Sequence, residues 1–475
     1  MRKLQVGVVL LTALLAACSS STTPSVDTAQ SLTLDSQAQF VPGEVIVKFK
    51  DGVAAQGISK LGIDANVDRT LSGGEVVLKL AGVSKQGMDA GAVTIESSAG
   101  KATLDAINKL RGQSNVEYAE PNFIMQATAV PNDTYYAQHQ WDMRQMNLPN
   151  AWNVTTGSGS PVVAVIDTGK TNHPDLAGRW VTGYDFISSS TTAKDGNGRD
   201  SDPTDVGDSG VCNGVNSPNS WHGTHVAGTI GAATNNNMGV AGVNWNARIS
   251  ALRVLGKCGG TTTDIADSIR WAAGIAVTGV PTNPNPAKVI NMSLGAYTGT
   301  SCPSTYQNAI NAAVARGVTV VIAAGNDNKT ASGATPANCA NVVTIAATRK
   351  DGGRAWYSNY GSVVDVAAPG GETNDANGNI DRDGDGYVDG ILSTLLNSTG
   401  SSYNYTFYQG TSMATPHVAG LVSLMYAVKP TITPAQVESI LKNTARPITH
   451  STCSVGCGAG LVDAYAAVNS AKALP

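Results

Sequence analysis

Four polar residues in short Gly- and Ala-rich motifs could together perform acyl transfer. Asp167 ends the segment "VIDTG", His222 opens "HGTHVAGT" and Ser412 lies in "GTSMATPHVAG". A serine hydroxyl is a weak nucleophile at neutral pH and needs a neighbouring base. A histidine can be that base when a carboxylate fixes its tautomer and stabilises the imidazolium. Asn326, which follows "AAG", has an amide that could donate to a developing oxyanion, as could free backbone N–H groups beside Ser412 at a helix N-terminus.

Each motif also has a simpler interpretation when it is taken alone. An aspartate at a strand end is commonly a turn former, and a serine at a helix start is commonly a cap. His222 and His225 are spaced so that they could hold a metal, which would favour a metallo-hydrolase, but no third ligand is evident. The combination of all four motifs therefore carries the functional argument.

The elements that would position these residues follow from hydrophobic patterning. Apolar, β-branched runs predict buried strands at 162–167, 248–255, 289–295, 318–325 and 341–348. Helical segments are predicted at 222–233, 262–277, 304–316, 412–427 and 434–444. Continuous apolar strands alternating with helices indicate an α/β fold with a parallel sheet covered on both faces. Functional residues in such sheets gather at the carboxyl ends of the strands.

A separate, smaller α+β pattern precedes this region. Alternating residues predict strands at 44–50 and 75–80, and "NVEYAEPN" predicts a final strand. Leu104, Ile107 and Leu110 have helical spacing, whereas the stretch 81–100 lacks a period and is predicted to be a loop.

In all four motifs at once, the chain resembles the subtilisin-like serine proteases (subtilases, peptidase family S8) over residues 131–475, down to "GAGLVDAYAAV". The resemblance implies a subtilisin-like sheet flanked by helices and an endopeptidase that forms an acyl-enzyme on Ser412. It makes Asp167, His222 and Ser412 the triad, and Asn326 part of the oxyanion hole. The alternative is an envelope lipoprotein scaffold of the same fold without catalysis.

The smaller unit resembles the inhibitory propeptide of the same family, a ferredoxin-like βαββαβ domain. On this basis its tail "PNFIMQATAV" would occupy the substrate groove until the enzyme removes it autocatalytically. The segment "VPNDTYY" resembles the mature start of thermitase and places the cleavage near 127–130. The expected domains are therefore a propeptide at 41–128 and a catalytic domain at 129–475.

The resemblance also indicates how a protein substrate would bind. Two edges are expected to pair with it as an added β-strand, and "AAG" is expected to form a wall of the main specificity pocket. The residues of these edges and this wall are Gly259, Gly260, Ser293, Leu294, Gly295, Ala323, Ala324 and Gly325. Neither "AAG" nor "ATPANC" at 334–339 contains an acidic residue, so broad specificity with an apolar preference is expected.

Clusters of oxygen-bearing residues are candidates for structural calcium. The family's strong site is matched by Asp133, Asp175 and Asn236, with backbone carbonyls of Thr234, Met238 and Val240. A second candidate comprises Asp195, Asp200, Asp202, Asp205 and Asp208, and a third comprises Asp381, Asp383, Asp385 and Asp389. The third is spaced like an EF-hand loop, but Leu392 replaces the glutamate of position twelve. Either acidic loop could instead be a solvated surface loop.

The N-terminus has the pattern of an export signal, and the composition limits the partners. Residues 1–17 combine a basic start with a short apolar run, and "LAAC" resembles a lipobox that would be lipidated at Cys18. Residues 18–40 are expected to be a flexible tether. The net charge of −4 does not favour nucleic-acid binding, and the apolar run at the N-terminus is the only strong one. A monomer is expected, with the mature enzyme extracellular and membrane contact only through the lipid of the precursor.

Export to an oxidising compartment makes the even number of remaining cysteines interpretable as three disulfides. These residues are Cys212, Cys258, Cys302, Cys339, Cys453 and Cys457. The sequence leaves their connectivity open, and pairing between sequence neighbours is our hypothesis.

Overall fold

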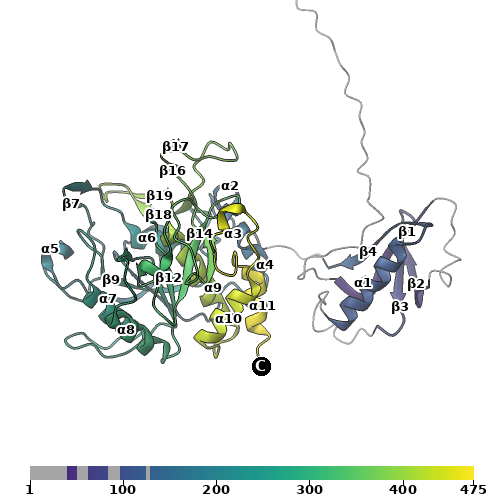
Figure 1. Cartoon of the computed structure of the whole chain (residues 1–475), viewed down its shortest axis with the longest axis horizontal. Helices are drawn as coiled ribbons and strands as arrows, with labels where there is room; N and C mark the ends of the chain where they lie inside the picture. The colour runs from purple at the N-terminus through teal and green to yellow at the C-terminus, as the bar shows by residue number, and fades with distance from the viewer. Residues whose placement is uncertain (1–39, 51–61, 84–96, 125–128) are drawn as a thin grey trace, which may run out of the picture. The chain divides into compact units, whose positions relative to one another are not determined.

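The structure is a computed structural model that describes residues 40–50, 62–83, 97–124 and 129–475. The chain divides into an N-terminal unit, 1–127, and a C-terminal unit, 128–475 (Figure 1). The predictions for the signal, Cys18 and the tether up to residue 39 lie outside the described residues.

The N-terminal unit is a four-stranded antiparallel sheet covered by a helix. Its strands are β1 (Phe40–Phe49), β2 (Ala65–Thr70), β3 (Val76–Leu80) and β4 (Val116–Phe123), in the order β2-β3-β1-β4, and its helix is α1 (Ser98–Arg111). The side chain of Ser97 caps α1 by accepting from the Gly100 N–H, and Ile107 and Leu110 pack against Val45 and Leu78. The strand order is that of a ferredoxin-like fold. A first helix of the expected βαββαβ pattern would fall in 51–61, outside the described residues.

The C-terminal unit contains a seven-stranded parallel sheet, which confirms the predicted fold class. The sheet order is β15-β14-β12-β10-β5-β9-β6. The strands are β5 (Val162–Asp167), β6 (Trp180–Asp185), β9 (Arg248–Arg253), β10 (Val289–Met292), β12 (Thr319–Ala323), β14 (Val343–Thr348) and β15 (Val366–Pro369).

Two apolar cores lie on opposite faces of this sheet, because successive side chains of a strand alternate in direction. Val163 and Val165 of β5 join one core and Ala164 and Ile166 join the other. The first core is covered by α6 (His222–Gly231), α9 (Thr411–Val428), α10 (Pro434–Thr444) and α11 (Ala464–Lys472). The second core is covered by α7 (Thr262–Ala272) and α8 (Ser304–Val314), which Figure 1 shows away from α9 and α10.

Shorter elements connect and cover this framework. The strands among them are β7 (Gly210–Cys212), β8 (Val215–Ser217), β11 (Ala296–Tyr297), β13 (Ala334–Thr335), β16 (Asn374–Asp375), β17 (Gly378–Asn379), β18 (Ile391–Leu396) and β19 (Tyr403–Tyr408). The short helices are α2 (Tyr136–His139), α3 (Trp141–Gln145), α4 (Leu148–Trp152) and α5 (Ser190–Ala193). No helix in the described ranges is long and apolar enough to cross a membrane.

Three disulfides link the cysteines as sequence neighbours, the pairing that we expected. They are Cys212–Cys258, Cys302–Cys339 and Cys453–Cys457. The first ties the β7–β8 hairpin to the segment that contains Gly259 and Gly260.

Candidate active site

The ends of β5 and α6 bring Asp167 and His222 into contact. The Nδ1 atom of His222 lies 2.7 Å from Oδ1 of Asp167, which also accepts the backbone N–H of Thr168 at 2.8 Å. Asp167 is fully buried, whereas the side chain of His222 is 22% exposed. A Cβ at Gly223 would lie 2.5 Å from the carbonyl oxygen of Gly169, so only glycine allows α6 to begin this close to β5. The geometry is that of a histidine base oriented by a carboxylate.

Several carboxylates act on the charge of His222. Burial disfavours the imidazolium, but the negative charge and hydrogen bond of Asp167, together with the charges of Asp208 and Asp205, outweigh it. They raise the pKa of His222 above its usual 6.5. The charged form that a general base must adopt after taking a proton is therefore favoured.

Two residues of the 195–208 insert support this arrangement. Asp205 accepts the Thr168 hydroxyl at 2.7 Å, and burial raises the pKa of Asp205 to about 6. Asp208 accepts both the N–H of Ser220 at 2.6 Å and its hydroxyl at 2.7 Å, just before His222. The sequence had indicated these aspartates only as calcium ligands.

Ser412 stands in the first turn of α9 and lines the same cleft as His222. Gly410 precedes it with a φ of 149°, a conformation that favours glycine. The Ser412 hydroxyl donates to the carbonyl oxygen of Ser293 at 3.0 Å, so it must rotate toward His222 before it can transfer its proton. Such loose geometry is common in free enzymes.

The amide of Asn326 is held in one orientation. Its Oδ1 accepts both the N–H and the hydroxyl of Thr411, each at 2.9 Å. The Nδ2 donor is thereby fixed beside Gly410, where an added Cβ would lie 3.5 Å from it. First-turn N–H groups of a helix lack intrahelical acceptors, so the N–H of Ser412 is available as a second donor. Together these groups can stabilise an oxyanion.

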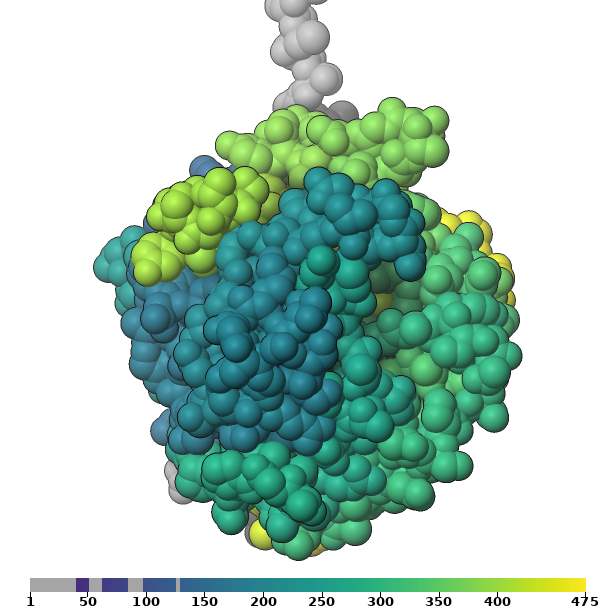
Figure 2. Space-filling view, turned by 90° about the vertical axis from the view of Figure 1, so that its left-hand side faces the viewer, coloured from purple at the N-terminus to yellow at the C-terminus, as the bar shows by residue number. Residues whose placement is uncertain are grey.

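One cleft of about 870 Å³ contains His222, Ser412 and Asn326. Figure 2 shows the surface hollowed between the teal and green parts of the C-terminal unit. The predicted substrate-contacting residues that line it are Gly259, Gly260, Ser293, Leu294, Gly295, Ala323 and Gly325. Ala324 does not line it: this residue lies in a buried apolar cluster with Ala331 and Ala346, because neighbours along a strand end point to opposite sides.

An acidic residue in the cleft was missed by the sequence reasoning. Asp327 also lines the cavity, and its Oδ2 accepts from the Asn359 amide at 3.2 Å. Asp327 directly follows Asn326 in the sequence, but the sequence does not show that its side chain points into the cleft. The expectation that the walls lack an acid therefore holds for "AAG" and "ATPANC" but not for the whole cleft.

The first calcium candidate places two buried carboxylates together. Burial raises the pKa of both Asp133 and Asp175, and the charge of Asp133 adds to the shift of Asp175. The Oδ1 atom of Asp133 is buried without a hydrogen-bond partner among the described residues. A divalent cation fits this charge and this oxygen. Asn236, however, donates its amide to Asp175 at 2.7 Å, so it would have to turn its oxygen inward to be a ligand.

The backbone positions of this first candidate lie in the same loop. The N–H of Val240 donates to Oδ2 of Asp175 at 3.0 Å, and the N–H of Met238 donates to the Asn236 side chain at 2.9 Å. The Thr234 hydroxyl donates to the carbonyl of Ala232 at 3.1 Å. Two residues of this loop, Asn236 and Val240, therefore donate to the Asp175 carboxylate.

Among the described residues, no three acids of the second calcium candidate form a group with oxygens within 4.8 Å of one another, and calcium binding by this insert stays a prediction. Asp195 forms an ion pair with the buried Arg253 at 2.5 Å, while Asp205 and Asp208 face Thr168 and Ser220. Asp200 and Asp202 accept backbone N–H groups of the insert's own turns. Each of these aspartates therefore accepts a hydrogen bond or ion pair from a different donor.

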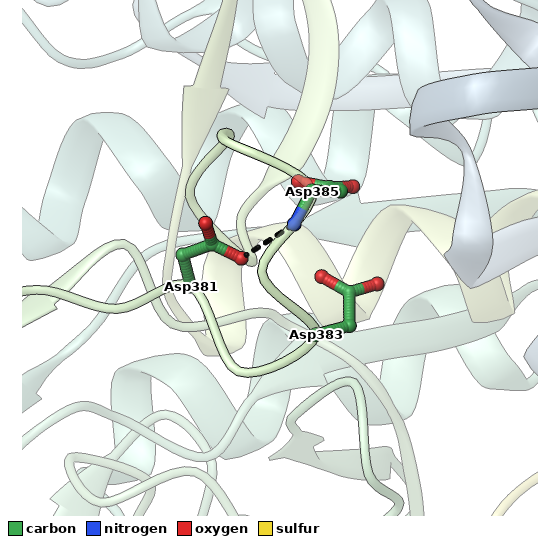
Figure 3. A group of neighbouring side chains, drawn as sticks. All are labelled: Asp381, Asp383 and Asp385. Atoms are coloured by element: carbon green, nitrogen blue, oxygen red, sulfur yellow. Dashed lines mark hydrogen bonds between the residues drawn. The ribbon is translucent and has the colours of Figure 1, made fainter. Parts of the chain in front are cut away.

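Three of the four aspartates of the third calcium candidate lie close together. Asp381, Asp383 and Asp385 offer oxygens within 4.8 Å of one another on the surface (Figure 3). Asp381 accepts the N–H groups of Gly384 at 2.8 Å and Asp385 at 3.2 Å. Asp389 is fully buried, and its Oδ2 accepts the backbone N–H of Arg382 at 3.0 Å.

A lysine competes for this third candidate. The Nζ atom of Lys350 contacts Asp383 at 2.5 Å, Asp389 at 3.2 Å and Asp385 at 3.4 Å. The loop therefore already has a cation, and a calcium ion there would have to displace or share it. The oxygens fit calcium less well than those around Asp175.

The metallo-hydrolase alternative requires His222 and His225 to face one ion. Instead, Nε2 of His225 donates to the Thr406 carbonyl at 2.9 Å and its ring stacks on Tyr408. Burial lowers the pKa of His225 to about 3, so it stays neutral. The two histidines therefore bind different groups, His222 the Asp167 carboxylate and His225 the Thr406 carbonyl.

Comparisons with known proteins identify the family. Residues 158–460 match the subtilase family, so the chain belongs to the subtilases, a family of serine proteases. Residues 27–122 match the fervidolysin N-terminal prodomain, in agreement with the propeptide resemblance.

Three relatives illustrate the similarity. An extracellular protease of Xanthomonas campestris is 52% identical over 77% of this chain, and the match spans 61% of that protein. Thermitase of Thermoactinomyces vulgaris is 37% identical over 71% of this chain and 99% of its own length. The structure of a protease from Pseudoalteromonas arctica has 52% identity and a TM-score of 0.67, and covers 72% of this chain and all of its own.

Proposed function

We propose that this protein is an exported serine endopeptidase that cuts protein substrates and removes its own propeptide. The observation that carries the proposal is the Asp167–His222 hydrogen bond of 2.7 Å in the cleft that also contains Ser412 and Asn326. The non-catalytic scaffold alternative is not supported, because every residue needed for acyl transfer is present and the relatives above are named proteases.

The reaction follows from the chemistry of these side chains. The Ser412 oxygen attacks the scissile carbonyl carbon while Nε2 of His222 takes the hydroxyl proton. Asp167 holds the Nδ1–H and stabilises the imidazolium, and the Asn326 amide and Ser412 N–H bind the oxyanion. His222 then gives the proton to the leaving amine, which departs and leaves an acyl-enzyme. A water, deprotonated by His222, releases the acid and restores Ser412.

Substrate recognition would rest mainly on the backbone. Gly259, Gly260 and the 293–295 segment line the same cleft, where an extended peptide can pair as an added strand. Main-chain pairing tolerates many sequences, and Ala323 and Leu294 present apolar surface to a side chain. We therefore expect broad specificity with an apolar preference, to which Asp327 adds tolerance for basic side chains.

Calcium would stabilise the folded state and would not take part in the reaction. Asp133 and Asp175 would hold it, together with Asn236 and the backbone of the 234–240 loop. When bound, the ion supplies positive charge to two buried carboxylates. It takes no part in the proton transfers of the triad.

The test is the precursor with Ser412→Ala, compared with wild type for self-processing and casein hydrolysis. We expect the variant to remain uncut and inactive while keeping its fold, because removal of a triad member leaves only roughly 10³–10⁴-fold catalysis over water. Maturation of the variant at the wild-type rate, without added protease, would contradict the proposal.

A further inference from the structure

The first turn of α9 lacks one regular hydrogen bond because Pro416 has no N–H. In an unbroken helix that N–H would donate to the carbonyl of Ser412, four residues earlier. The Ser293 hydroxyl donates to this carbonyl instead, at 2.8 Å. The turn that holds the nucleophile is therefore fixed in part by a side chain from outside the helix.

His417 supports the next carbonyl of the same turn. Its Nδ1 lies 2.8 Å from the carbonyl oxygen of Met413, the residue after Ser412, and its Nε2 lies 2.8 Å from Oδ2 of Asp142. A carbonyl can only accept, so Nδ1 carries a hydrogen, and a second proton is shared between Nε2 and the carboxylate. Asp142 and His417 are both fully buried.

Asp142 is itself firmly anchored. It lies in α3, near the start of the C-terminal unit, between two residues of the main core. Trp141 donates its indole N–H to the Gly390 carbonyl at 3.1 Å, and Met143 is 1% exposed. The Asp142–His417 contact therefore connects the segment that follows the expected cleavage region to the turn that carries Ser412.

The buried Asp142–His417 pair is expected to add little net stability to the fold. The Oδ1 atom of Asp142 is buried with no hydrogen-bond partner within the described part of the chain. Apolar residues of similar volume often replace a buried ionic pair with no loss of stability. Such a pair fixes the positions of the groups that it joins more than it adds net stability.

We propose that Asp142, acting through His417, is a positioning residue that sets the orientation of Ser412 for attack. The inference rests on the proposed function of Ser412 as the nucleophile. A misplacement of the reacting atoms by about 1 Å can cost on the order of 10²-fold in rate. Loss of the pair should therefore lower kcat, while substrate binding along the cleft edges, and so KM, stays the same.

The deciding experiment separates folding from positioning. We expect the apolar double variant Asp142→Leu/His417→Met to fold with a Tm near that of wild type, yet to lose roughly 10- to 100-fold in kcat on a peptide ester at unchanged KM. The folded fraction of Asp142→Ala should show the same loss of kcat. Asp142→Asn can still donate to a neutral Nε2 and should restore most of the rate.

Tyr426→Phe is the matched control. It removes a buried hydrogen bond from the same helix, between the Tyr426 hydroxyl and Thr319 at 3.1 Å, but about four turns away from Ser412. It should lower Tm and leave kcat unchanged. The positioning role would be overturned if the folded Asp142→Leu/His417→Met variant kept the wild-type kcat. It would also be overturned if Asp142→Asn and Asp142→Ala lost kcat equally. An inactive wild-type protein would instead refute the proposed function.

Discussion

The amide of Asn326 is held by Thr411 so that its nitrogen, not its oxygen, is free to face a reacting carbonyl. We predict that Asn326→Ala folds normally and loses roughly 10²–10³ in kcat, the size known for the equivalent asparagine of subtilisin. Steady-state kinetics on a peptide substrate measure this, with the exposed Asn443→Ala on α10 as a control. An unchanged kcat would remove Asn326 from the oxyanion hole.

The charge on His222 gives a second prediction at the scale of one residue. The carboxylates around it raise the pKa of His222, and a general base works only when neutral. Activity should therefore be lost as pH falls through this raised pKa, so the acid limb of kcat/KM should lie above pH 6.5. A pH profile tests this, and a limb below that value would show that desolvation, not the carboxylates, controls the histidine.

The sequence alone indicates those residues whose proposed role depends on their type within a motif. Asp167, His222, Ser412 and Asn326 could be predicted because each motif follows a strand or begins a helix. The roles of Asp205 and Asp208 could not, since the sequence does not show that Thr168 and Ser220 lie within their reach. Asp327 was missed for the same reason: the direction of its side chain depends on Asn359.

At the scale of elements, the loop 234–240 and Asp133 enclose Asp175. A ligand that binds only the folded state stabilises it by RT ln(1 + [L]/Kd), about 2.7 kcal/mol at a hundredfold excess over Kd. We predict that EGTA lowers Tm and speeds self-digestion, and that Asp175→Ala removes most of this dependence. Thermal melts with calcium and with EGTA measure it.

Asp381→Ala is the comparison that assigns the effect to one loop. It should keep the calcium dependence, because Lys350 already supplies positive charge beside the Asp381 loop. If the dependence disappears with Asp381→Ala and not with Asp175→Ala, the calcium site lies in the loop of Figure 3. Identical melts of wild type under both conditions would exclude a stabilising ion.

The strong apolar strands and the long helices could be predicted, but the edges of the sheets could not. Strand β6 contains Gly183, where a Cβ would lie 2.1 Å from the Ala251 carbonyl oxygen, and its register shifts nearby. Strand β2 is largely exposed and has no apolar alternation. Pairing determines these strands more than their own residues do: β6 pairs with the distant β9, and β2 pairs with its neighbour β3.

At the scale of the whole molecule, the expected lipid on Cys18 and the expected cleavage near 127–130 have a joint consequence. The acyl chains would anchor only what remains covalently attached to Cys18, so processing would release the C-terminal unit. We predict that wild-type C-terminal unit appears in the medium, whereas the uncut Ser412→Ala precursor stays with the membrane fraction. Immunoblots of cell fractions measure this, and an equally soluble variant precursor would show that Cys18 is not an anchor.

The central claim is that Ser412 is the nucleophile, and covalent labelling tests it most directly. A serine-directed phosphonate should inactivate the matured protein, and peptide mass mapping should locate one adduct on Ser412. A zinc-specific chelator should leave the activity intact. Full casein hydrolysis after complete labelling of Ser412, or inactivation with the adduct on another residue, would contradict the account.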